Sequence, residues 1–157
     1  MKKARYIALI AAAVLVICMV TGCGSSGDAA KSTATAKQVV GDKQEALMTV
    51  DLTGGYCVEF ASGAAYFYKG EPSDENEAIA FGYVLTKKEY DEEVAYITSD
   101  KVEADEVKDL GDGVYSYGTD FFFPTEDGFY MKVAVQEAGA DEADSIYPRF
   151  SARASEW

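Results

Sequence analysis

The side chains that carry most enzyme chemistry are scarce in this chain. It contains no histidine, so the usual general base and the commonest metal ligand are both missing. A serine–histidine–aspartate triad is therefore impossible, and no Ser-x-x-Lys or glycine-rich phosphate-binding motif takes its place. Carboxylate pairs suited to glycoside hydrolysis arise by chance among 27 acidic residues. We expect no catalytic residue and no cofactor.

Acidic residues are concentrated in two loops, which are therefore candidate calcium sites. The first is the stretch 71–77 and the second holds Glu126 and Asp127. Calcium takes oxygen ligands from such loops, but the Asp-x-Asp-x-Asp-Gly spacing of a calcium-binding loop is absent. We therefore interpret both as solvated acidic loops and expect no metal site.

The first of three cysteines lies inside an apolar segment, and the second lies three residues after the end of that segment. Lys2, Lys3 and Arg5 precede the apolar run 6–20, which is interrupted only by the weakly polar thiol of Cys18. This run is too short to span a bilayer, which needs about 20 residues. A positive start, a short apolar run and small residues before Cys23 are typical of a secretory signal.

The four residues Val20-Thr21-Gly22-Cys23 resemble the lipobox of bacterial lipoproteins. The resemblance implies cleavage after Gly22, a diacylglyceryl thioether on Cys23 and acylation of the new amine. One acyl chain holds a protein to a membrane only marginally, whereas two or more give stable attachment. We expect a lipid-anchored protein on the extracytoplasmic face of the cell membrane. The alternative is an ordinary signal peptide that leaves Cys23 unmodified.

Signal loss and lipidation together leave Cys57 as the only thiol. We therefore expect no intramolecular disulfide and interpret Cys57 as a small buried hydrophobe. A reactive thiol would need a cationic neighbour to lower its pKa.

The net negative charge of the chain excludes further classes of binding partner. After residue 22 the chain keeps 11 basic and 27 acidic residues, a formal charge of −16. Nucleic-acid binding needs a basic face, so no nucleic acid is expected. The same charge disfavours lying flat on an anionic membrane. Solubility is the simplest interpretation, and an acidic patch for a cationic partner or a metal is the alternative.

Three regions are expected along the chain. Residues 1–22 form the signal peptide, and residues 23–46 form a flexible tether because small and polar side chains dominate there. Residues 47–157 form a single domain, which we expect to be monomeric.

The first half of this domain alternates apolar and polar side chains. Residues 48–61, 64–69 and 78–85 are predicted strands, with Gly54 and Gly55 as a bulge in the first. A capping box of Thr86 and Glu89 opens a helix that ends near residue 99. Its residues Tyr90, Val94 and Ile97 fall at i, i+4 and i+7 and form one apolar stripe.

The second half is predicted as a strand meander and a helix. The strands are expected at 101–110, 114–117, 120–123 and 129–136. The helix is expected at 141–153, with Ile146 and Phe150 spaced i, i+4, and Pro148 is expected to kink or divide it. We expect the core to include four apolar side chains: Phe60, Phe81, Met131 and Val133.

The order of these elements predicts an α+β fold, an antiparallel sheet with two helices packed on one face. The layout of residues 47–157 resembles the fold of the extrinsic oxygen-evolving protein of photosystem II and the Ran-binding Mog-type proteins. The segments VDLTGGYCVEFASGAAYFY and EAIAFGYVLTKKEYDEE are similar to small, uncharacterised lipoproteins of anaerobic Gram-positive bacteria. No functional motif of either group is present, so the resemblances imply no site residue.

The chain is rich in aromatic side chains, and this excess is the compositional feature that points most clearly to a function. After the signal, ten tyrosines, eight phenylalanines and one tryptophan remain. The pair Tyr66 and Tyr68 shares one strand face, and so does the pair Tyr115 and Tyr117. Tyrosine is common at binding surfaces, although many of these rings must build the core. We predict a non-catalytic binding or scaffold module whose aromatic face takes a glycan or protein, with an envelope hydrolase that uses carboxylates as the alternative.

Overall fold

The computed structural model describes residues 21–23 and 33–155. The basic start and the apolar run of the predicted signal lie outside the described residues, as does the stretch 24–32 of the predicted tether. No helix in the described part of the chain is long and apolar enough to span a membrane.

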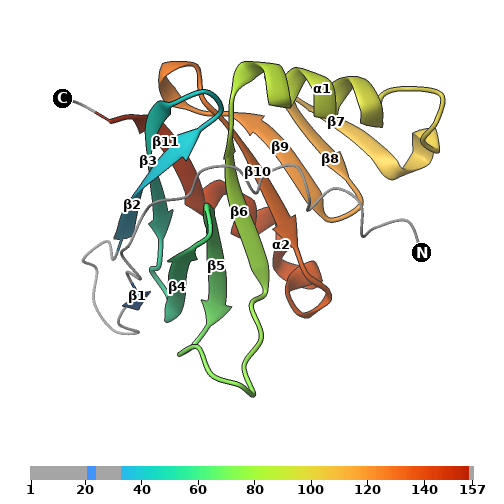
Figure 1. The fold of residues 1–157 in the computed structure, drawn as a ribbon. Coiled ribbons are helices and arrows are strands. Elements are labelled where there is room, and N and C mark those ends of the chain that lie inside the picture. The colour runs from blue at the N-terminus through green and yellow to red at the C-terminus, as the bar shows by residue number, and fades with distance from the viewer. Residues whose placement is uncertain (1–20, 24–32, 156–157) are drawn as a thin grey trace.

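Two antiparallel sheets and two helices make up the fold, which confirms the α+β class (Figure 1). The larger sheet has eight strands in the spatial order β1 (Thr21–Cys23), β4 (Tyr56–Ala61), β5 (Ala64–Lys69), β6 (Ala80–Leu85), β10 (Tyr130–Val135), β9 (Asp120–Pro124), β8 (Val114–Tyr117) and β7 (Val107–Gly111). The smaller sheet has the order β11 (Phe150–Ala154), β3 (Gln44–Asp51) and β2 (Thr33–Val40). The helices are α1 (Lys87–Ile97) and α2 (Ala143–Ile146), and short 3-10 turns occupy η2 (Ala104–Glu106), η3 (Glu126–Gly128), η4 (Glu137–Glu142) and η5 (Tyr147–Arg149).

The capping box predicted for the first helix is confirmed. The Thr86 side chain accepts a hydrogen bond from the Glu89 amide, and the Glu89 carboxylate accepts one from the Thr86 amide at 2.7 Å. These two bonds satisfy backbone donors that a helix start otherwise leaves unpaired. Tyr90 and Ile97 are buried against the sheet, as their spacing predicts.

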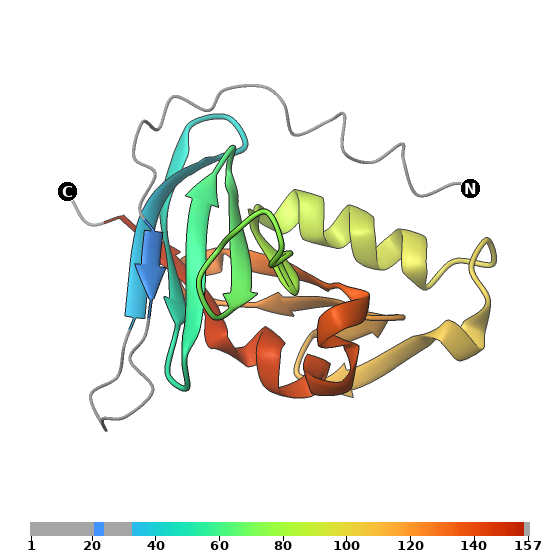
Figure 2. The ribbon, with the colours of Figure 1, turned by 90° about the horizontal axis from the view of Figure 1, so that it is seen from below.

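The two helices lie on opposite faces of the larger sheet, so the expectation of both on one face is not confirmed. Phe122 of β9 packs with Tyr90 and Ile97 of α1. Its neighbours Phe121 and Phe123 point the other way and contact Tyr147, which directly follows α2. Figure 2 shows α1 and α2 on either side of these strands. Successive residues of a strand face opposite sides of the sheet, and the sequence pattern does not indicate against which side each helix packs.

The main core lies between the two sheets. Phe150 of β11 packs edge-on to Phe67 of β5, with ring centroids 5.5 Å apart. A side chain on Gly82 of β6 would come within 2.5 Å of the Phe150 ring, so the glycine makes room for the second sheet. Burial of Phe60, Met131 and Val133 is confirmed. Burial of Phe81 is wrong, because this ring is half-buried on the opposite face of β6.

The folded region begins earlier than predicted. Residues 33–40, assigned to the tether, form β2 and pair with β3 along its whole length. Ala34, Gln38 and Val40 are buried in alternation with exposed residues. Threonine favours strands, but alanine and glutamine carry too little hydrophobicity for the alternation to be visible in the sequence.

Two elements of the sequence prediction divide in the structure. The expected strand 48–61 becomes β3 and β4, which belong to different sheets and are joined by a turn at Gly54 and Gly55 with φ of 101° and 89°. The expected helix 141–153 becomes α2, a 3-10 turn and β11. Phe150 and Ala152 are buried at strand spacing, whereas the sequence prediction paired Ile146 with Phe150 at helical spacing.

Candidate binding face

One row of side chains crosses the larger sheet on the face that carries α1. Tyr66 of β5 is the register partner of Phe81 of β6, and Phe81 is the partner of Ala134 of β10. Ala134 is the partner of Asp120 of β9, which in turn is the partner of Tyr117 of β8. Directly opposed residues in an antiparallel sheet point to the same face. The two tyrosine pairs predicted from separate strands therefore share one surface.

The other predicted tyrosines lie on the same face, two residues along their strands. Tyr68 follows Tyr66 on β5, and Tyr115 precedes Tyr117 on β8. The neighbouring row brings in Tyr83 of β6, a residue that the sequence prediction missed. The alternation of residues 78–85 predicted the strand that carries Tyr83. That pattern does not tell which strands lie next to it, so it does not show that Tyr83 lies beside other tyrosines.

Helix α1 covers only part of this face. Leu85 and Phe122 are buried beneath Tyr90 and Ile97, and Tyr115 and Tyr117 both pack against the edge of this cluster. We call five half-buried rings the tyrosine face, namely Tyr66, Tyr68, Phe81 and Tyr83 outside the cluster and Tyr117 at its edge. Their partial exposure distinguishes them from the fully enclosed rings on the opposite face of the sheet.

Rings and carboxylates alternate on the tyrosine face. Tyr66 and Phe81 pack edge to face, with centroids 5.2 Å apart. The Tyr68 hydroxyl donates a hydrogen bond to the Glu59 carboxylate at 3.2 Å. Asp120 stands in the row between Phe81 and Tyr117. The surface therefore combines flat apolar rings with acceptors that carry negative charge.

The same carboxylates act on the tyrosine hydroxyls. Partial burial, and next the negative charge of Glu59, raise the pKa of Tyr68. Burial raises the pKa of Tyr83, helped by Tyr66 and Asp120. The pKa of Tyr117 is raised by desolvation and then by Glu106, which accepts its hydrogen bond. All three hydroxyls therefore remain protonated donors at neutral pH.

Alkaline titration should reveal the environment of Tyr83. Its folded-state pKa is above the usual 10.0, so its protonated form contributes stability that is complete below pH 10 and is lost as the pH rises through the raised value. We expect Tyr83→Phe to remove a late-ionising part of the 295 nm absorbance change. The unfolded protein should show no such late phase. Loss of an early-ionising tyrosine instead would contradict the described surroundings of Tyr83.

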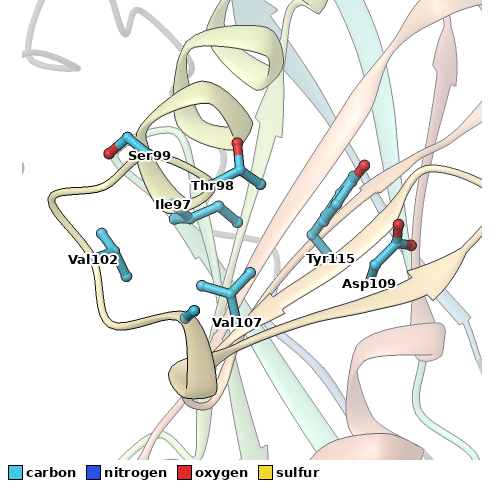
Figure 3. A pocket seen from close by; sticks show the side chains of 8 residues that line it. Ile97, Thr98, Ser99, Val102, Val107, Asp109 and Tyr115 are labelled. Carbon is cyan, nitrogen blue, oxygen red and sulfur yellow. The ribbon is translucent and has the colours of Figure 1, made fainter.

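A pocket of about 370 Å³ continues the face at the end of α1 (Figure 3). The end of α1, the loop that follows it, β7 and β8 line this pocket. The apolar lining residues are Ile97, Val102, Ala104 and Val107, and the polar ones are Thr98, Ser99, Asp109 and Tyr115. Val107 and Asp109 are the register partners of Tyr117 and Tyr115. The pocket is therefore contiguous with the tyrosine face.

Three of the four polar lining residues already make hydrogen bonds within the protein, and one of them is Asp109, whose Oδ1 atom accepts the Gly111 amide at 2.9 Å. The Thr98 hydroxyl donates to the Val94 carbonyl and the Ser99 hydroxyl to the Tyr96 carbonyl, both at 2.6 Å. These bonds close the last turn of α1. In Figure 3 the Asp109 carboxylate and the Tyr115 hydroxyl lie side by side across the pocket from Ser99.

The expectation that the chain forms no intramolecular disulfide is wrong for this structure. Cys57 is disulfide-bonded, and its backbone partner across the β1–β4 ladder is Cys23. The sequence prediction removed Cys23 from the thiol count because it assigned this sulfur to a lipid. Predicted cleavage after Gly22 would also remove two of the three residues of β1.

The acidic loops do not assemble into a recognisable cation site in the described residues. No group of three or more cysteine, aspartate or glutamate side chains there is arranged to hold a metal ion. The loop 71–77 is instead held by Asn76, whose side-chain amide donates to the carbonyls of Lys69 and Glu71.

No protein-family model, curated protein or solved structure matches this chain. The candidate function is therefore inferred from the geometry of the tyrosine face and the pocket.

Proposed function

We propose that this protein is a lipid-anchored, extracytoplasmic binding module that engages its ligand through the tyrosine face. The observation that carries the proposal is the row from Tyr66 through Phe81 and Asp120 to Tyr117 on one side of the larger sheet. Half-buried tyrosines offer a large apolar contact area and a hydroxyl at low entropic cost.

The pocket favours binding over hydrolysis. Hydrolysis of a glycoside by carboxylates needs an acid and a second carboxylate on opposite sides of the scissile bond. Asp109 is the only carboxylate that lines the pocket within the described residues. Apolar walls with a few polar groups are the usual composition of a ligand site.

Two probes test the proposal on the full-length lipoprotein in non-ionic detergent: a decalysine peptide and a chitin-type hexasaccharide. At least one should bind in calorimetry. Tyr66→Ala and Tyr117→Ala, at the two ends of the row, should each weaken that binding by about tenfold, as truncation of an anchoring ring does.

Val39→Ala is the matched control, because Val39 is an exposed apolar residue on β2 of the other sheet. Its affinity should equal that of the unchanged protein. Absence of binding by both probes, or equal binding by the tyrosine variants, would overturn the proposal.

A further inference from the structure

We infer that the occupant of the tyrosine face is a basic polypeptide segment, one lysine of which enters the pocket beside Asp109 and Tyr115. This inference rests on the proposed function and names the partner chemistry. Four features of the described residues support it. They are the negative charge of the surface, the C-terminal end of α1, a lysine already bound on this face, and the width of the sheet.

Charge on this surface is predominantly negative. Glu59 and Asp120 lie on the same side of the sheet as the tyrosine face, and Asp109 lines the pocket. The loop between α1 and β7 adds four carboxylates and one lysine, namely Asp100, Glu103, Asp105, Glu106 and Lys101. Charge complementarity selects a cationic partner. It also disfavours a second copy of this chain, which would bring the same negative charge.

The end of α1 favours a cation independently of the side chains. A helix carries partial negative charge at its C-terminus, where basic residues are stabilising. The last turn of α1 has no basic residue, and Ile97, Thr98 and Ser99 of this helix end line the pocket. A ligand cation would supply the charge that this terminus lacks.

This face already holds one lysine in the same chemical surroundings. The Lys132 ammonium lies 5.2 Å from the centroid of the Phe122 ring and 3.9 Å from the Glu93 carboxylate. A ring and a carboxylate together are a favourable environment for an ammonium group. Tyr115 and Asp109 offer the same pair of groups, within walls that suit the methylene stem of lysine.

Asp109 suits lysine better than arginine. Its Oδ1 atom already accepts the Gly111 amide at 2.9 Å. A guanidinium prefers to engage both oxygens of a carboxylate, so it would have to share this atom, whereas an ammonium needs only one acceptor.

Dimensions match a short extended segment. From β5 to β7 the sheet advances five strands, which at about 4.8 Å each is about 24 Å. An extended chain covers this distance with about seven residues, at about 3.3 Å per residue. Such a segment would contact Tyr66 at one end and place a lysine in the pocket at the other.

The experiment measures binding of decalysine, decaarginine and the hexasaccharide to the full-length lipoprotein in non-ionic detergent. Asp109→Asn should weaken decalysine binding by about tenfold, the loss expected for a hydrogen bond to a charged group. Its effect on decaarginine should be smaller. Asp144→Asn is the matched control, since it removes the same charge from an exposed position on α2, beyond the opposite face of the sheet. It should change the affinity by less than twofold.

Equal losses for Asp109→Asn and Asp144→Asn would overturn the inference, because they would indicate attraction by net charge alone. A preference for the hexasaccharide that depends on Tyr66 would also overturn it while supporting the proposed function. Failure of all three probes to bind would count against both.

Discussion

Replacing Cys23 with alanine should abolish lipid labelling completely and leave the precursor uncut. The thiol of this residue is the acceptor of the diacylglyceryl group in the lipobox interpretation, and alanine has no sulfur to form the thioether. Loss of the acyl chains removes about 0.8 kcal/mol of membrane affinity per buried methylene. Incorporation of labelled palmitate, followed by membrane fractionation, measures the effect in the native host.

Cys57→Ala provides the matched control, since it removes a buried cysteine and leaves the acceptor intact. This variant should be labelled and retained like the unchanged protein. A Cys23→Ala protein that is processed normally and stays with the membrane would contradict the anchor.

Phe150→Ala should lower the free energy of unfolding by roughly 3 to 5 kcal/mol, as truncation of a core phenylalanine does. Its ring is 2% exposed and fills the space above Gly82 between the two sheets. Guanidinium unfolding followed by circular dichroism measures the change. Phe81→Ala is the matched control on the half-buried side of β6 and should cost about 1 kcal/mol. Equal costs would contradict the assignment of the two faces.

Local signals predicted local elements well. Residues 114–117 form β8 as expected, and the Thr86–Glu89 capping box marks the start of α1. Both depend on neighbours within a few residues, where turn and capping chemistry acts. The alternation around Met131 likewise identified a strand and its buried face.

Longer-range features were not predictable in the same way. The sheet brings β5 within three strands of β9 although more than 50 residues separate them in the chain, so no sequence pattern places Tyr66 in one row with Asp120. Residues 33–40 form β2 by pairing with β3, and their weakly apolar side chains do not signal this pairing in the sequence. The pocket combines a helix end, a loop and an edge strand, and only Tyr115 of its lining was expected from the sequence.

The central claim is that one surface, the tyrosine face with its pocket, recognises a cationic segment. Amide chemical-shift mapping on the isotope-labelled full-length protein in micelles, titrated with decalysine, tests it most directly. We predict shifts concentrated at Tyr66, Tyr83, Tyr117 and Asp109, which lie on four strands of one face. Shifts concentrated in the acidic loop 71–77, or spread evenly over all acidic residues, would contradict the claim.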